Sequence, residues 1–63
     1  MNYEPLSDDL RIRQEGESYL MWEYNDGNWE WSRRMSDPEM REMTADYDWI
    51  EERDGYDYWR RSH

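Results

Sequence analysis

The segment SYLMWEYNDGNWEWSRR, residues 18–34, constrains the fold more than any other part of this chain. Asp26-Gly27 lies between two runs rich in Trp and Tyr. An Asp-Gly pair flanked by strand-forming residues is a strong signal for a two-residue hairpin turn, because a type I′ turn needs positive φ at both central positions. The sequence therefore predicts a β-hairpin with strands over about residues 18–24 and 28–34.

The length of the hairpin loop decides which side chains share a face of the sheet. A three-residue loop would place Trp22 opposite Glu30 and scatter the aromatic residues over both faces. A two-residue loop gathers them on one face, where aromatic cross-strand pairs stabilise a sheet by about 0.2–1 kcal/mol each. We therefore expect the two-residue loop, which predicts the pairs Tyr24–Trp29, Trp22–Trp31 and Leu20–Arg33.

The chain has few aliphatic residues with which to build a core. Leu, Ile, Val and Phe total five of 63 residues, and this content with a net charge of −9 is typical of disorder. Five Trp, six Tyr and five Met offset the shortage, since each buried aromatic removes about 150–250 Å² from water. We expect one marginally stable domain over residues 1–63, a monomer or weak homodimer, with the aromatic hairpin face in its core. The alternative, an exposed platform for stacking nucleic-acid bases, is disfavoured by the negative charge.

Two further segments complete the predicted fold. Residues 10–14 alternate apolar and polar side chains, which predicts a short strand, and residues 1–9 are expected to form a loose arm. A capping-box pattern at residues 36–39 precedes apolar residues at helical spacing, Met40, Met43, Tyr47 and Ile50, and Gly55 ends that pattern. We expect an α+β fold: a three-stranded antiparallel meander (10–14, 18–24, 28–34), its aromatic face covered by one helix over about residues 37–53, and a short C-terminal helical turn or strand.

Charge and residue content disfavour several classes of function. A net charge of −9 opposes direct binding to nucleic acid or to an anionic membrane, and residues 1–15 lack the apolar run of a signal peptide. The chain has no Cys, its one His is the terminal His63, and a small chain cannot build a large catalytic cleft. The turns at 25–28 and 54–57 lack calcium-loop spacing. We expect a cytoplasmic, non-enzymatic protein without a cofactor or a specific metal site.

A partner-binding surface is predicted on the outer side of the helix. At 100° per residue, Glu42, Asp46 and Glu52 lie opposite the apolar stripe, and Trp49 lies on the same outer side. Trp is enriched at interaction hot spots. Trp49 would alternatively pack against the C-terminal tail, near Tyr58 or Arg53. The predicted surface consists of Glu39, Glu42, Asp46, Asp48, Trp49, Glu51 and Glu52.

Two functions fit such a surface. Closely spaced carboxylates imitate a nucleic-acid backbone and are attracted over long range to channels lined by Arg and Lys. In size, charge and aromatic content the chain resembles phage-type inhibitors of host defence, such as nucleic-acid-mimicking anti-CRISPR and anti-restriction proteins. The negative charge predicts a basic nucleic-acid-binding protein or complex as partner, and the setting would be the cytoplasm of a bacterial host if the chain is phage-encoded. The alternative is a small adaptor or regulatory protein that docks through Trp49, with acids that serve only solubility.

Overall fold

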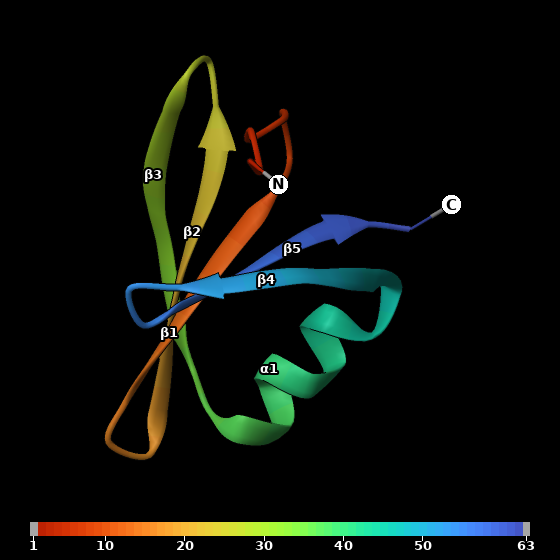
Figure 1. Cartoon of the computed structure of the whole chain (residues 1–63). Coiled ribbons are helices and arrows are strands. Elements are labelled where there is room, and N and C mark those ends of the chain that lie inside the picture. Colours follow the sequence, from red (N-terminus) through yellow and green to blue (C-terminus); the bar gives the residue numbers. More distant parts are fainter. Residues whose placement is uncertain (1, 63) are drawn as a thin grey trace.

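The computed structural model describes residues 2–62, which form an antiparallel sheet of five strands and one short helix (Figure 1). In chain order the elements are β1 (Leu10–Glu15), β2 (Ser18–Asn25), β3 (Asn28–Met35), α1 (Asp37–Met43), the 3-10 turn η1 (Thr44–Asp46), β4 (Tyr47–Arg53) and β5 (Tyr56–Arg61). The strand order is β3-β2-β1-β5-β4, so β1 lies in the middle and β3 and β4 form the edges. Figure 1 shows a strongly twisted sheet, in which the β2–β3 hairpin runs crosswise to β4 and β5.

The aromatic hairpin has the predicted two-residue turn. Asp26 and Gly27 take φ values of 51° and 82°, as a type I′ turn requires. The predicted pairs Tyr24–Trp29 and Trp22–Trp31 are confirmed. The third predicted pair is wrong, because the register shifts between Met21 and Trp22 and places Leu20 opposite Arg34 instead of Arg33. One extra residue in a strand at such a β-bulge changes the partner of every residue beyond it.

The predicted three-stranded fold is wrong in the second half of the chain. The helix begins as predicted, with Ser36 Oγ accepting from the Glu39 N–H at 3.3 Å and the Glu39 carboxylate accepting from the Ser36 N–H at 2.8 Å. It ends at Met43 instead of near residue 53. Asp54 and Gly55 take φ values of 54° and 86°, so they form a second two-residue turn that joins β4 to β5. The C-terminal element is therefore a strand, and it pairs with β1.

The apolar core lies between the sheet and α1. Its buried members are Leu10, Ile12, Met21 and Met35, with Tyr19, Met40, Met43, Tyr47 and Trp59 packed against them. The expectation that the helix covers the aromatic face of the hairpin is therefore wrong. The register of the central strand β1 determines which face of the sheet holds the core, because Ile12 lies opposite Met21 while Arg11 lies opposite Trp22. The apolar side chains of β1 thus share a face with Met21, and its arginines share a face with Trp22.

The opposite side of the sheet carries a second cluster, which we call the aromatic face: Tyr3, Trp22, Tyr24, Trp29, Trp31, Tyr56 and Tyr58. The Arg11 guanidinium lies within it, 5.2, 5.0 and 4.4 Å from the ring centres of Trp22, Trp29 and Tyr56. Trp29 and Tyr58 approach to 5.6 Å although β2 and β1 separate their strands, so the sheet curls toward this face. Attraction between the cation and the rings replaces a helical cover.

Candidate interaction surfaces

The seven predicted partner-binding residues do not lie on one helix. Glu39 and Glu42 belong to α1, Asp46 to η1, and the other four residues to β4. The predicted helical projection that grouped Glu42, Asp46 and Glu52 is therefore wrong. Glu52 lies on a strand, where successive side chains point to opposite faces, so the spacing that placed it beside Asp46 does not apply. The acids that were expected to form one surface are divided between the α1–η1 segment and the two faces of β4.

Glu39, Glu42 and Asp46 line a shallow groove of about 360 Å³ beside α1, together with Arg33, Met43, Tyr47 and Arg61. Arg61 donates from Nη2 to the Tyr47 hydroxyl at 3.0 Å and stacks over that ring at 5.0 Å. The hydrogen bond from the Ser36 backbone N–H holds the pKa of Glu39 below its usual value, so this carboxylate caps the helix. The groove carries both signs of charge.

The β4 residues divide between the two faces of the sheet. Trp49 lies opposite Trp59 and Glu52 opposite Asp57, on the side of α1. Glu51 lies opposite Tyr58 and pairs with Arg53. Trp49 is 55% exposed, and its Nε1–H donates to Asp57 Oδ1 at 3.0 Å. Trp49 therefore forms its hydrogen bond with Asp57 of the C-terminal strand. The alternative interpretation had placed it near Tyr58 or Arg53.

Asp57 completes a site that the sequence did not indicate. With Trp49 and Glu52 it forms a cluster on the β4–β5 hairpin, which we call the Trp49 site. The signal that would have found Asp57 is Asp54-Gly55, the same pair that marks the first hairpin. Read as a turn, it places Asp57 directly opposite Glu52.

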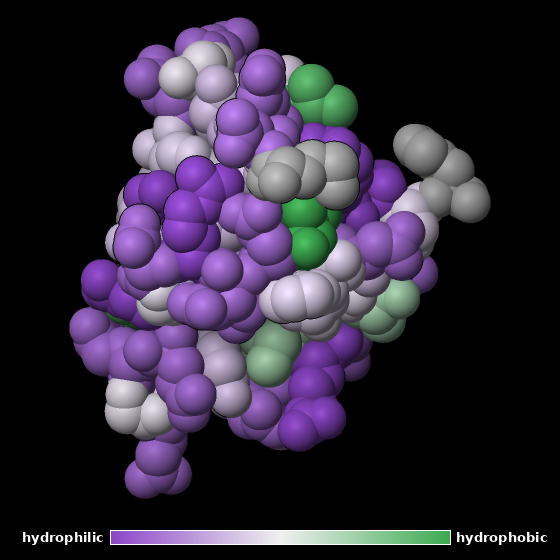
Figure 2. All heavy atoms as spheres, in the orientation of Figure 1, coloured by the Kyte–Doolittle hydropathy of each residue, from purple (hydrophilic) through white to green (hydrophobic). Residues whose placement is uncertain are grey.

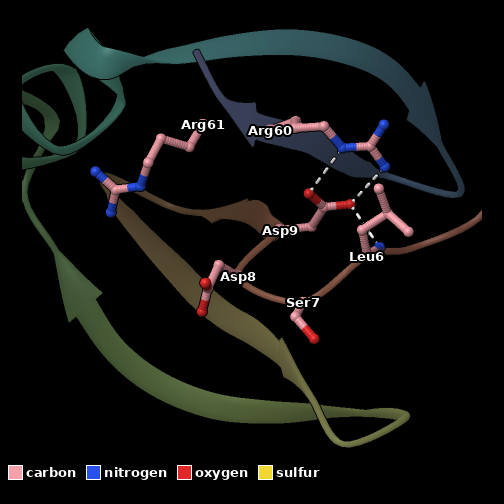
Figure 3. A pocket seen from close by; sticks show the side chains of 6 residues that line it. All are labelled: Leu6, Ser7, Asp8, Asp9, Arg60 and Arg61. Atoms are coloured by element: carbon pink, nitrogen blue, oxygen red, sulfur yellow. Dashed lines mark hydrogen bonds and ion pairs between the residues drawn. The ribbon is translucent and has the colours of Figure 1, made fainter. Parts of the chain in front are cut away.

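A buried ion pair joins the N-terminal residues to β5. The Asp9 side chain is 2% exposed and accepts from Arg60 Nε and Nη2 at 3.0 and 2.9 Å (Figure 3). It also accepts from the Leu6 N–H at 2.9 Å and from the Tyr3 hydroxyl at 2.6 Å. Burial opposes ionisation of Asp9, but the bonds from Arg60, Tyr3 and Leu6 outweigh it, and its pKa is lowered. Burial and the neighbouring Asp9 raise the pKa of Tyr3.

The pocket in Figure 3, of about 240 Å³, is lined by Leu6, Ser7, Asp8, Asp9, Arg60 and Arg61. Asp9 and Arg60 point toward each other there. Because both oxygens of Asp9 accept hydrogen bonds from Arg60, this carboxylate has a structural role and links the start of β1 to β5.

Most carboxylates of the protein have no positively charged partner among the described residues. Four of the 17 acids, Asp9, Glu15, Asp37 and Glu51, form ion pairs. The other 13 have none within residues 2–62: Glu4, Asp8, Glu17, Glu23, Asp26, Glu30, Glu39, Glu42, Asp46, Asp48, Glu52, Asp54 and Asp57. Hydrophilic residues cover most of the side seen in Figure 2, and the hydrophobic areas there are small and separated.

Two cross-strand pairs bring acids face to face. Glu23 lies opposite Glu30, and Glu52 lies opposite Asp57. We call these the acid pairs. Like charges directly opposite on neighbouring strands are destabilising. Elsewhere the same sheet uses opposite charges, since Asp48 lies opposite Arg60.

In the described part of the chain, no group of three His, Cys, Asp or Glu side chains is arranged to hold a metal ion. No helix between residues 2 and 62 has the length and apolar character to cross a membrane. His63, the one histidine of the sequence, lies outside the described residues. No family model, curated protein or solved structure matches this chain.

Proposed function

We propose that this protein is a non-enzymatic acidic inhibitor that occupies the basic nucleic-acid site of a DNA- or RNA-handling protein or complex. The observation that carries the proposal is the two acid pairs, Glu23–Glu30 and Glu52–Asp57. Each costs stability, by about 0.2–1 kcal/mol relative to a neutral pair. A need for solubility alone is met by scattered charges and does not call for acids directly opposite each other. A basic partner offsets this cost on binding.

The density of negative charge supports the same proposal. The molecule measures 29 × 24 × 22 Å, and 13 of its carboxylates lack an ion-pair partner in the described residues. A B-DNA duplex of the same 29 Å length carries about 17 phosphate charges. The protein therefore presents a comparable charge over a comparable length, and a channel lined by Arg and Lys attracts both.

The cellular compartment in which the protein acts follows from the kind of partner. Nucleic-acid-handling complexes of a bacterial host work in its cytoplasm, and an inhibitor of phage type acts there. The protein itself does not bind nucleic acid, because its charge repels phosphates. It acts as a monomer or weak homodimer.

The experiment is competitive capture from a bacterial lysate. The immobilised protein should retain a nucleic-acid-binding protein that duplex DNA or RNA displaces and that leaves as salt is raised, since screening weakens attraction between charges. A variant with the acid pairs neutralised, Glu23→Gln, Glu30→Gln, Glu52→Gln and Asp57→Asn, should lose this capture. The matched control removes the same number of charges elsewhere, by Glu4→Gln, Glu17→Gln, Asp26→Asn and Asp54→Asn, and should retain more of it. Capture that resists both competitors and salt would overturn the proposal.

A second candidate is favoured by the exposure of Trp49. A small adaptor that docks through this side chain would bury an indole that is now 55% exposed. Its binding would persist at high salt and disappear in Trp49→Leu. Salt response therefore separates the two candidates.

A further inference from the structure

The chain's own arginines show how this fold holds a guanidinium group. Arg60 lies 5.6 Å over the Tyr3 ring while it donates two hydrogen bonds to Asp9, at 3.0 and 2.9 Å. The Tyr3 hydroxyl donates to the same carboxylate at 2.6 Å. Ring, carboxylate and guanidinium thus contact one another pairwise. Five of the eight arginines stack on a Trp or Tyr ring in this structure: Arg11, Arg13, Arg53, Arg60 and Arg61.

Trp49 and Asp57 repeat two members of this arrangement. The Trp49 Nε1–H donates to Asp57 Oδ1 at 3.0 Å, as the Tyr3 hydroxyl does to Asp9. Glu52, directly opposite Asp57, adds a second carboxylate. One oxygen of Glu52 accepts from the Gly55 N–H at 2.9 Å, which orients the side chain at the turn.

The third member of this arrangement, a guanidinium group, is missing at Trp49 within residues 2–62. No described arginine stacks on Trp49, and neither Asp57 nor Glu52 forms an ion pair there. Among the described Trp and Tyr residues, Trp49 alone has neither a paired ring nor a stacked arginine and is not packed against the core. The ring is 55% exposed on an edge strand, where a partner can approach it.

We infer that the Trp49 site binds an arginine side chain of the partner protein. The guanidinium stacks on the Trp49 ring and donates to the carboxylates of Asp57 and Glu52. Arginine fits better than lysine because its planar group stacks on aromatic rings and donates two parallel hydrogen bonds to carboxylates. The inference rests on the proposed function, since it names the group that a basic partner presents.

The test compares two peptides of equal length and charge, one with arginine and one with lysine as its only charged residue type. Both cations attract the ring, but only arginine adds a second parallel hydrogen bond to a carboxylate, so the arginine peptide should bind about two- to fivefold more tightly, the equivalent of about 0.5–1 kcal/mol. It should also shift the Trp49 indole N–H signal in NMR spectra of the unaltered protein. Trp49→Leu and Asp57→Asn should each remove the preference for arginine.

The control is Trp31→Leu. Trp31 is also 55% exposed and also lies on an edge strand, but no carboxylate of residues 2–62 accepts from its indole, so its loss should leave the preference unchanged. Equal binding of both peptides, or a preference that survives Trp49→Leu and Asp57→Asn, would overturn the arginine site and leave the proposed function standing. Failure of both peptides to bind even at low salt would overturn the proposed function as well.

Discussion

Asp9 and Arg60, 51 residues apart in the chain, form a two-pronged ion pair in which each Asp9 oxygen accepts from the guanidinium, at 3.0 and 2.9 Å. The pair connects the start of β1 to β5, and the Tyr3 hydroxyl adds a third hydrogen bond to the same carboxylate. The Asp9 side chain is 2% exposed and that of Arg60 is 40% exposed, so solvent screens one partner only. This contact joins the first and last parts of the described chain.

Asp9→Asn should destabilise the protein by about 2–3 kcal/mol in urea unfolding. Removing one partner of a fully buried pair costs about 3–5 kcal/mol, and the exposure of Arg60 reduces this. The control is Glu15→Gln, because Glu15 and Arg34 form a pair at 3.2 Å in which both side chains are more than half exposed. That change should cost less than about 1 kcal/mol. Similar losses for the two variants would contradict the structural role of Asp9.

The lowered pKa of Asp9 predicts that the stability of the protein depends on pH. The pKa of Asp9 is lower in the folded protein than in the unfolded chain, where it is about 3.9, so the unfolded chain binds more protons between the two values. The contribution of Asp9 is complete above about pH 5 and is lost as the pH falls through the folded pKa. The stability difference between the natural protein and Asp9→Asn should therefore be constant above about pH 5 and shrink below about pH 4. A difference that grows with acidity would contradict this sign.

Gly55→Ala tests the second hairpin. Gly55 has a φ of 86°, and a Cβ added there meets nothing within 4 Å, so the expected cost is that of the backbone conformation, about 1–2 kcal/mol. Gly55→Asn should cost less, since Asn tolerates positive φ. In the long helix that the sequence predicted, Gly55 would follow the last turn. Thermal unfolding that is unaffected by Gly55→Ala would show that this turn is not formed.

Glu30→Arg should raise stability and lower partner binding. The new side chain lies opposite Glu23 and replaces repulsion with attraction, a gain of about 0.2–1 kcal/mol. Glu17→Arg, in the turn between β1 and β2, makes the same change of charge without an acid opposite it and should alter stability less. Unfolding midpoints measure the first effect, and lysate capture measures the second. A gain in stability without any loss of capture would separate the acid pair from function.

Local signals account for the first half of the fold. Asp26-Gly27 and the alternating aromatic residues were sufficient to predict the β2–β3 hairpin and its pairing near the turn. Ser36 and Glu39 were sufficient to predict the start of α1. Each of these features depends on neighbours within a few residues, which is why sequence reasoning succeeded there.

Only the tertiary structure decided the rest. Met43, Tyr47 and Ile50 have spacing that suits a helix, but Tyr47 and Ile50 lie on β4, which pairs with β5, and β5 pairs with β1 through Leu10–Trp59. The pairing of β5 with β1 joins residues almost fifty positions apart, so no local sequence pattern indicates it. The contact between Trp49 and Asp57, by contrast, lies within the β4–β5 hairpin. The sequence by itself thus determined the first hairpin turn, the start of the helix and the negative charge. Long-range strand pairing determined which face of the sheet holds the core, because pairing satisfies backbone hydrogen bonds and overrides the weaker preference of a short segment for helix.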